Sequence, residues 1–200
     1  RIALKYRTPV ILLSDGYLAN GSEPWKLPNV ADLPDISVPF QTELNHVDAD
    51  GNPEFWPYLR DETTLARPWA IPGTPGLMHR VGGLEKEDGS GNIDYTPDNH
   101  QRMTDLRAAK VEAVAADIAP TEVGGDADAD ILVLGWGSTW AAIDAAVQRR
   151  RRAGVKVAKA HLMHLNPLPP DLGEILRRYR RVILPELNRG QLAHHLRGTF

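Results

Sequence analysis

The clearest pattern of apolar and polar positions lies in the last hundred residues, where two periods alternate. A short apolar run typical of a buried strand occurs at residues 131–134, and two further strands are predicted at residues 155–165 and 181–184. Segments with apolar residues at helical spacing alternate with them, at residues 139–152, 171–179 and 190–197. Strands and helices that alternate at this spacing predict an α/β domain built on a doubly wound parallel sheet.

A further helix is expected just before this domain. Thr96 is a suitable N-cap, and Pro97 would occupy the first helical position. The residues at helical spacing after it are Met103, Leu106, Lys110, Val114 and Ile118, and the stem of the lysine can cover apolar surface. Pro120 is expected to end this helix. In the helix predicted at 139–152, the inward residues are expected to be Ile143, Ala146 and Val147.

The beginning of the chain predicts a strand followed by a polar loop. Residues 1–6 resemble the last turns of a helix, and Val10–Leu13 is a continuous apolar run typical of a buried strand. Ligand sites in open α/β sheets gather where such strands end, so Asp15, Asn20 and Ser22 are candidates for lining a site. The alternative is that Asp15 and Asn20 only satisfy backbone groups in a sharp bend, while Ser22 caps the next segment.

Residues 26–95 are rich in proline and glycine, a composition that by itself suggests a linker. Aromatic residues are too frequent for a solvated tether; they are Trp25, Phe40, Phe55, Trp56, Tyr58 and Trp69. We therefore expect a long ordered excursion that packs on a neighbouring domain or subunit, with residues 84–92 as an exposed tip. His79 and Arg80 could bind an anion or pair with an acid on a partner, or form an ordinary surface ion pair.

Two further features each allow a plain structural interpretation. The run Gly135-Trp136-Gly137-Ser138-Thr139 could hold a phosphate at a helix N-terminus, but a tight turn with an N-cap is the favoured interpretation, because the run is neither a Walker loop nor a full GxGxxG motif. Among seven histidines, His161 and His164 should point to opposite faces of a strand, and the adjacent His194 and His195 should diverge on a helix. The sequence therefore predicts no metal site and no hydrolase triad.

Composition narrows the class of protein. A net charge of −3 argues against a nucleic-acid or anionic-membrane binder, and the basic run at 149–152 is typical of a helix C-terminus. The absence of cysteine excludes disulfides, thiol catalysis and an iron–sulfur cluster carried by this chain. No apolar stretch is long enough to span a membrane and no signal peptide is evident, so a soluble cytoplasmic protein is expected.

Four stretches in this order resemble the α-subunit of 2-oxoacid:ferredoxin oxidoreductases, particularly the 2-oxoglutarate type. They are Thr8–Trp25, Pro72–Gly83, Asn99–Arg107 and Leu184–Leu192. The resemblance implies that residues 1–25 are the tail of a pyrimidine-binding domain of the thiamine-diphosphate fold. Residues 26–95 would then connect it to a transketolase C-terminal-like domain at 96–200, incomplete at its end.

The family reaction implies the cofactors and partners of the intact enzyme. It is the oxidative decarboxylation of 2-oxoglutarate with coenzyme A to succinyl-CoA, with reduction of ferredoxin. Thiamine diphosphate with Mg²⁺ and a [4Fe–4S] cluster would be bound mostly by a β-subunit, so neither would be complete in this chain. No nucleic acid or membrane is expected among the partners.

The resemblance transfers no catalytic residue to this chain. The substrate-carboxylate motif of the family does not occur in the sequence, and the glutamate that activates the cofactor is expected upstream of residue 1. We therefore expect the chain alone to be inactive, with Asp15, Asn20, Ser22, His79 and Arg80 lining the site or a subunit interface. The alternative is a non-catalytic assembly module of a related pyruvate or branched-chain 2-oxoacid oxidoreductase.

Overall fold

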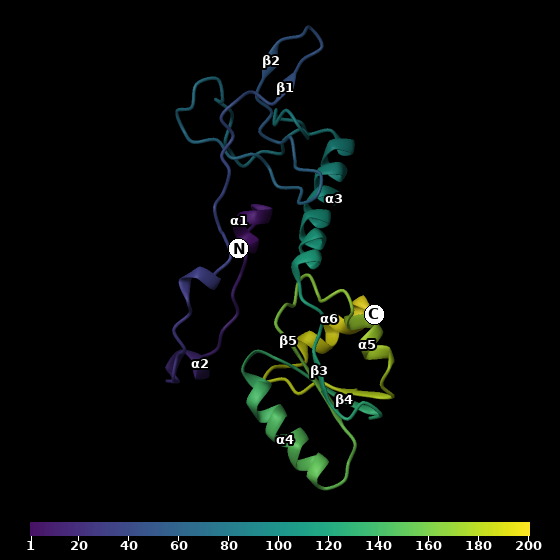
Figure 1. Cartoon of the computed structure of the whole chain (residues 1–200). Coiled ribbons are helices and arrows are strands. Elements are labelled where there is room, and N and C mark those ends of the chain that lie inside the picture. Colours follow the sequence, from purple (N-terminus) through teal and green to yellow (C-terminus); the bar gives the residue numbers. More distant parts are fainter. The chain divides into compact units, whose positions relative to one another are not determined.

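The computed structural model describes all 200 residues, which form two units (Figure 1). The first unit comprises residues 1–11 and 27–114, and the second comprises residues 12–26 and 115–200. The domain boundaries expected at residues 25 and 95 remain predictions.

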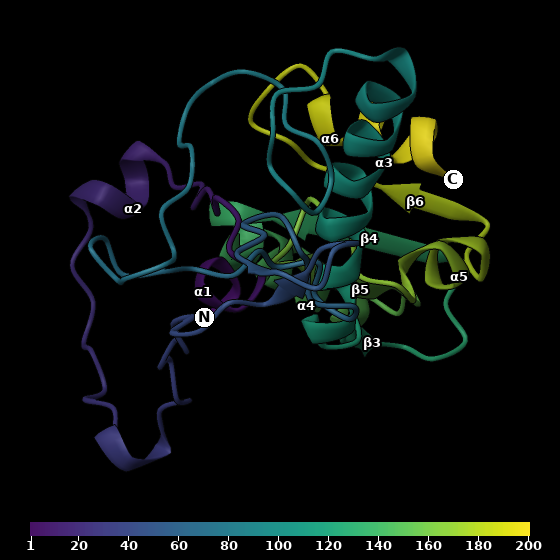
Figure 2. The same ribbon diagram turned by 90° about the horizontal axis from the view of Figure 1, so that it is seen from above.

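The second unit contains a four-stranded sheet. Its strands and helices are α2 (Gly16–Asn20), β3 (Val123–Gly125), β4 (Ile131–Trp136), α4 (Trp140–Arg152), β5 (Ala158–Leu162), α5 (Leu172–Arg177), β6 (Arg181–Ile183) and α6 (Gln191–Thr199). The strand order is β3-β5-β4-β6, which can be followed across the sheet in Figure 2. Strand β4 runs parallel to both β5 and β6, whereas β3 runs antiparallel to β5.

The predicted α/β class is confirmed, but the expectation of a purely parallel sheet is wrong at one edge. The antiparallel strand β3 consists of Val-Gly-Gly and is exposed throughout. Because it has neither an apolar run nor an alternating pattern, nothing in its sequence indicated a strand. The three predicted parallel strands are all present, although β5 is shorter than expected and ends at Leu162.

Alternation along β4 divides the core of the second unit between the two faces of the sheet. Leu132 and Leu134 are fully buried and belong to a cluster that includes Leu172 of α5 and Leu192 of α6. Ile131 and Val133 point the other way and pack with Ile143 and Val147 of α4. Helices therefore cover both faces, as a doubly wound arrangement requires.

Helix α4 buries two of its three expected inward residues. Ile143 and Val147 are buried one turn apart, but Ala146 is exposed, contrary to the expectation. Ala146 lies on the flank of α4, along an open groove that Ile183 of β6 also lines. The helix covers only part of this face of the sheet, so a residue off its central stripe stays exposed.

The first unit has little regular structure. Its elements are α1 (Ile2–Tyr6), a 3-10 turn (Val30–Asp32), the antiparallel pair β1 (His46–Val47) and β2 (Pro53–Glu54), and α3 (Pro97–Ala113). Helix α3 begins at Pro97 as predicted and continues as a 3-10 turn over Val114–Asp117. The side chain of Asn45 is hydrogen-bonded to both backbone groups of Trp56, at 2.7 and 3.1 Å. Side-chain contacts of this kind replace the ladders of a sheet.

Residues 84–92 are not the exposed tip that their composition predicts. Lys86, Gly89 and Gly91 are buried, and the loop passes directly under the rings of Trp56 and Tyr58. A Cβ on Gly89 would lie 2.6 Å from two ring atoms of Trp56. Glycine permits this close approach, so here a glycine-rich stretch is a packing feature and not a mark of exposure.

The strand predicted at Val10–Leu13 is also absent. The segment is extended but pairs with no other strand, and its side chains are between 55% and 91% exposed. A strand forms only where a neighbouring segment accepts its backbone hydrogen bonds, and no segment of the 200 residues does so. Ser22 likewise precedes no helix. None of the helices in the structure is long and apolar enough to cross a membrane.

Candidate functional site

The carboxyl edge of the sheet in the second unit is the candidate site. Strands β4 and β6 are parallel neighbours, and the helices that come after them, α4 and α6, pack on opposite faces. In open α/β sheets, ligands bind outside the carboxyl ends of strands at such a switch point. Here the edge is built from the turn at 137–139 after β4 and from residues 184–190 after β6.

The turn after β4 is held by its own side chain. The hydroxyl of Thr139 accepts a hydrogen bond from the amide of Trp136 at 3.2 Å and donates to its carbonyl at 2.7 Å. Gly137 has φ +59°, and a Cβ on Gly135 would lie 2.5 Å from Ile143. Both glycines are therefore required by local geometry, which supports the tight-turn interpretation of this motif.

His161, near the end of β5, borders the same turn. Burial lowers the pKa of His161, and a hydrogen bond to the backbone of Gly137 opposes this change. Because the net pKa lies below the ordinary value of 6.5, the imidazole is mostly neutral at pH 7. A neutral ring that donates to Gly137 keeps an acceptor nitrogen for another group.

Asp15 reaches this edge from α2. Its carboxylate accepts the amide of Leu18 at 3.0 Å, as an N-cap, and also interacts with the side chain of Ser138. The hydrogen bonds from Ser138 and then Leu18 lower the pKa of Asp15, so it is ionised at neutral pH. The side chain of Asp15 thus satisfies a backbone amide in the bend, as the alternative interpretation predicts, and it also contacts the turn after β4.

The other predicted site residues, Asn20, Ser22, His79 and Arg80, are divided between the two units. Asn20 donates to the carbonyl of Gly16 at 2.7 Å inside α2, and Ser22 is exposed just beyond that helix. His79 and Arg80 belong to the first unit. The ring of His79 lies 2.9 Å from the carbonyl of Leu77, while Arg80 is exposed and forms no ion pair, contrary to the surface-pair interpretation. The assignment of these residues to a site remains a prediction.

Glu186 is a residue of this edge that sequence reasoning missed. Its two oxygens accept the amides of Leu192 and Ala193 at 3.0 and 3.1 Å, at the start of α6. Burial raises the pKa of Glu186, but these hydrogen bonds, with others from Asn188 and Trp136, outweigh it and leave the pKa lowered. The available signal was an acid and an asparagine just before a predicted helix, a pattern typical of capping.

The expectation that His161 and His164 point to opposite faces is wrong. Strand β5 ends at Leu162, so His164 no longer follows the alternation, and both histidines line one cavity of about 520 Å³. Lys159 and Glu122 line the same cavity. Lys159 is paired with Asp144 and lies 5.6 Å from the ring centroid of Trp140. No group of three or more histidine or acidic side chains in the chain is arranged to hold a metal ion.

The sequence of this chain is similar to those of known oxidoreductase subunits. The chain is 53% identical, over its whole length, to the 2-oxoglutarate oxidoreductase subunit KorA of Mycobacterium tuberculosis, of which it spans 29%. It is 32% identical, over 94% of its length, to the α-subunit of 2-oxoacid:ferredoxin oxidoreductase 1 of Aeropyrum pernix, again spanning 29% of that subunit. No family model matches the chain.

A solved structure agrees with these relatives. The 2-oxoglutarate:ferredoxin oxidoreductase of Magnetococcus marinus, with 2-oxoglutarate, coenzyme A and succinyl-CoA bound, superposes with a TM-score of 0.84 at 34% identity. The match covers 98% of this chain and 33% of that one. The chain therefore spans about a third of each of these relatives, and over nearly its whole length it matches part of 2-oxoacid:ferredoxin oxidoreductase α-subunits, as the sequence motifs predict.

Proposed function

We propose that this chain is part of the α-subunit of a cytoplasmic 2-oxoglutarate:ferredoxin oxidoreductase. The intact enzyme would convert 2-oxoglutarate and coenzyme A to succinyl-CoA and carbon dioxide, with transfer of the electrons to ferredoxin. The observation that carries this proposal is the 53% identity, over the whole chain, to a 2-oxoglutarate oxidoreductase subunit. The bound 2-oxoglutarate, coenzyme A and succinyl-CoA of the structural relative support the same substrate class.

The residues of this chain do not fit the cofactors that the reaction requires. An iron–sulfur cluster is held by cysteine thiolates, and the chain contains no cysteine. Magnesium needs converging oxygen ligands, and no acidic cluster of that kind is present. The family resemblance implies that thiamine diphosphate, Mg²⁺ and the [4Fe–4S] cluster are bound mostly by a β-subunit, and we derive no catalytic step from residues of this chain.

The contribution of this chain would be to shape the site and to hold subunits together. The ionised Asp15, the hydroxyl of Ser138 and the neutral His161 offer hydrogen-bonding groups at the carboxyl edge of the sheet. Groups of this kind orient a substrate or a cofactor that carries the chemistry itself. The isolated chain is expected to be inactive.

The substrate is tested by assaying the intact complex with its β-subunit. We expect coenzyme-A-dependent reduction of ferredoxin with 2-oxoglutarate, at a kcat/KM at least about tenfold above that with pyruvate or a branched-chain 2-oxoacid. A tenfold preference corresponds to about 1.4 kcal/mol of transition-state binding. An equal or higher value with pyruvate would contradict the substrate assignment and favour the related oxidoreductases.

The alternative, a pure assembly role for the chain, is separated by an Asp15→Asn variant. Asparagine still caps α2, so the fold should be kept while the charge at the sheet edge is lost. A site role predicts a raised KM for 2-oxoglutarate or coenzyme A with the β-subunit still retained. An assembly role predicts weaker retention of the β-subunit with an unchanged KM. Asp98→Asn, at an exposed acid in the first turn of α3, is the matched control.

A further inference from the structure

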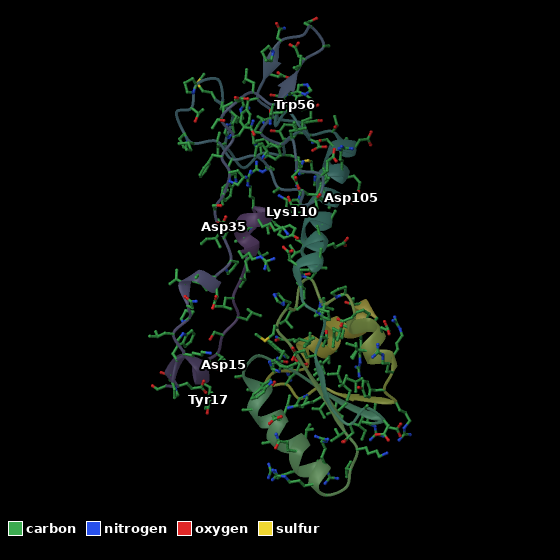
Figure 3. All side chains as sticks on the ribbon, in the orientation of Figure 1. Asp15, Tyr17, Asp35, Trp56, Asp105 and Lys110 are labelled. Atoms are coloured by element: carbon green, nitrogen blue, oxygen red, sulfur yellow. The ribbon has the colours of Figure 1, made fainter.

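A cavity of about 570 Å³ in the first unit is surrounded by positive charge. It lies between the start of the chain, the loop at 82–86 and helix α3. The charged side chains that line it are Arg60, Arg67, Lys86, Arg107, Lys110 and a single acid, Glu85. Figure 3 shows Lys110 on the side of α3 that faces α1. Such an excess of cations around one cavity is unfavourable unless something compensates it.

The acids near this cavity are already engaged with other cations. Glu85 forms an ion pair with Arg107 at 3.1 Å and is hydrogen-bonded to the ring of His100 at 2.7 Å. Asp88 is shared between Arg60 and Arg102. Asp61, which interacts with Arg7, is occupied by the amides and hydroxyl of the turn after it. None of these carboxylates is paired with Arg67 or Lys110.

Arg67 and Lys110 are therefore cations without an acidic partner. The guanidinium of Arg67 lies over the ring of Tyr58, 4.3 Å from its centroid, a cation–π contact and not an ion pair. Lys110 is half-buried on α3, and burial, followed by the charges of Arg60, Arg67 and Arg7, lowers the pKa of its ammonium to about 8. A nearby anion would oppose this lowering of the pKa of Lys110, because it would stabilise the charged form of the lysine.

We propose that this cavity is a binding site for a small dianionic phosphate group, held by Arg67 and Lys110. The planar guanidinium offers two parallel donors to phosphate oxygens, and the ammonium adds a point charge on the other side. Arg60, whose side chain is 9% exposed, supports the field although its own charge is shared with Asp88. Lys86 also has no acidic partner, but its ammonium already donates to the carbonyls of Gly82 and Leu84. A dianion would balance the two remaining cations, Arg67 and Lys110, which a monocarboxylate would do only in part.

Inorganic phosphate titrated into the intact protein tests the site directly. Isothermal titration calorimetry at neutral pH and low salt should show saturable binding to one site. Lys110→Met, which keeps the apolar stem on α3, should weaken binding by about tenfold or more, since charge-assisted contacts of this kind are strong. Lys26→Met, at an exposed lysine outside the cavity, removes the same charge and should leave the affinity unchanged.

A second measurement needs no substitution. NMR titration of the Lys110 side chain should show that saturating phosphate raises its pKa from about 8 toward the ordinary value of 10.5. Absence of saturable phosphate binding, or equal loss of affinity in both lysine variants, would overturn the proposal. A Lys110 pKa already near 10.5 in the phosphate-free intact protein would overturn it too, because the lysine would then not lie in the half-buried, uncompensated cationic surroundings on which the proposal rests.

Discussion

The two units of this chain bury different kinds of groups. The second unit has an apolar cluster around the sheet, in which Leu132, Leu134 and Leu172 are almost completely excluded from solvent. The buried residues of the first unit include Lys86 and Asn99 beside its apolar ones. The amide of Asn99 donates to the carbonyls of Lys86 and Asp94, at 3.0 and 3.3 Å. The core of the second unit is thus apolar, whereas the first unit buries satisfied polar groups beside its apolar residues.

This difference determines how each unit responds to change. Burial of one leucine side chain contributes about 1.5–3 kcal/mol, whereas a single intramolecular hydrogen bond contributes only about 0.5–1.5 kcal/mol net. A buried polar group that loses its partner, however, costs about 1–3 kcal/mol. We therefore expect the second unit to be sensitive to the volume of its side chains, and the first to steric and electrostatic fit.

The largest effect is expected from Leu132→Ala in β4. Leu132 is 0% exposed, and its removal leaves a cavity between the sheet and helices α5 and α6. The free energy of unfolding should fall by about 2–5 kcal/mol. Urea unfolding with hydrogen exchange resolved by residue should assign the loss to the second unit. A loss confined to the first unit would contradict the comparison.

A smaller loss is expected from Gly89→Ala in the first unit. The new methyl would lie 2.6 Å from the ring of Trp56, at a residue with φ +84°. Gly51→Ala is the matched control, because Gly51 has φ +87° but no atom within 4 Å of the position that a methyl would occupy. Gly89→Ala should destabilise the unit by about 1–3 kcal/mol more than the control, as overpacking does. Equal losses would mean that Trp56 moves aside freely.

The lowered pKa of Lys110 predicts that the stability of the first unit depends on pH. The folded pKa of Lys110, about 8, lies below its ordinary value of 10.5, so the unfolded chain binds more protons between these values. Stability from this group is therefore lowest below pH 8 and rises as the pH increases through this window. The melting temperature of the Lys110→Met variant should lack this rise. An identical pH profile in both proteins would show that Lys110 is not perturbed.

The smallest effect is expected at an exposed pair of the second unit. Arg178 and Glu174 are one helical turn apart at 2.6 Å, and both side chains are more than half exposed. Glu174→Gln should change the free energy of unfolding by no more than about 0.5 kcal/mol, because solvent screens such pairs. A loss above about 1 kcal/mol in urea unfolding would show that surface charge matters in the second unit as well.

The sequence predicted regular elements where one period dominated. The strands at 131 and 181 and the helices that begin near Pro97, Trp140 and Gln191 were expected from apolar spacing, although the N-cap residues of these three helices make no side-chain capping hydrogen bond. These signals are local, so they persist in a single sequence. The family resemblance was likewise contained in short motifs, and relatives at 53% and 32% identity confirm it.

Features that need a contact with a residue far away in the sequence were decided only by the tertiary structure. Val10–Leu13 has the composition of a strand, but a strand also needs a neighbour, and Val123–Gly125 became a strand because β5 was available. Residues 84–92 have the composition of a tip but lie under two aromatic rings. The gathering of cations around Lys110 depends on residues many positions apart, namely Arg7, Arg60 and Arg67. The sequence by itself determined the periodic elements and the family resemblance, because short stretches of sequence contain both signals. Strand pairing, side-chain burial and charge balance were decided only by the tertiary structure, because they depend on contacts between distant residues.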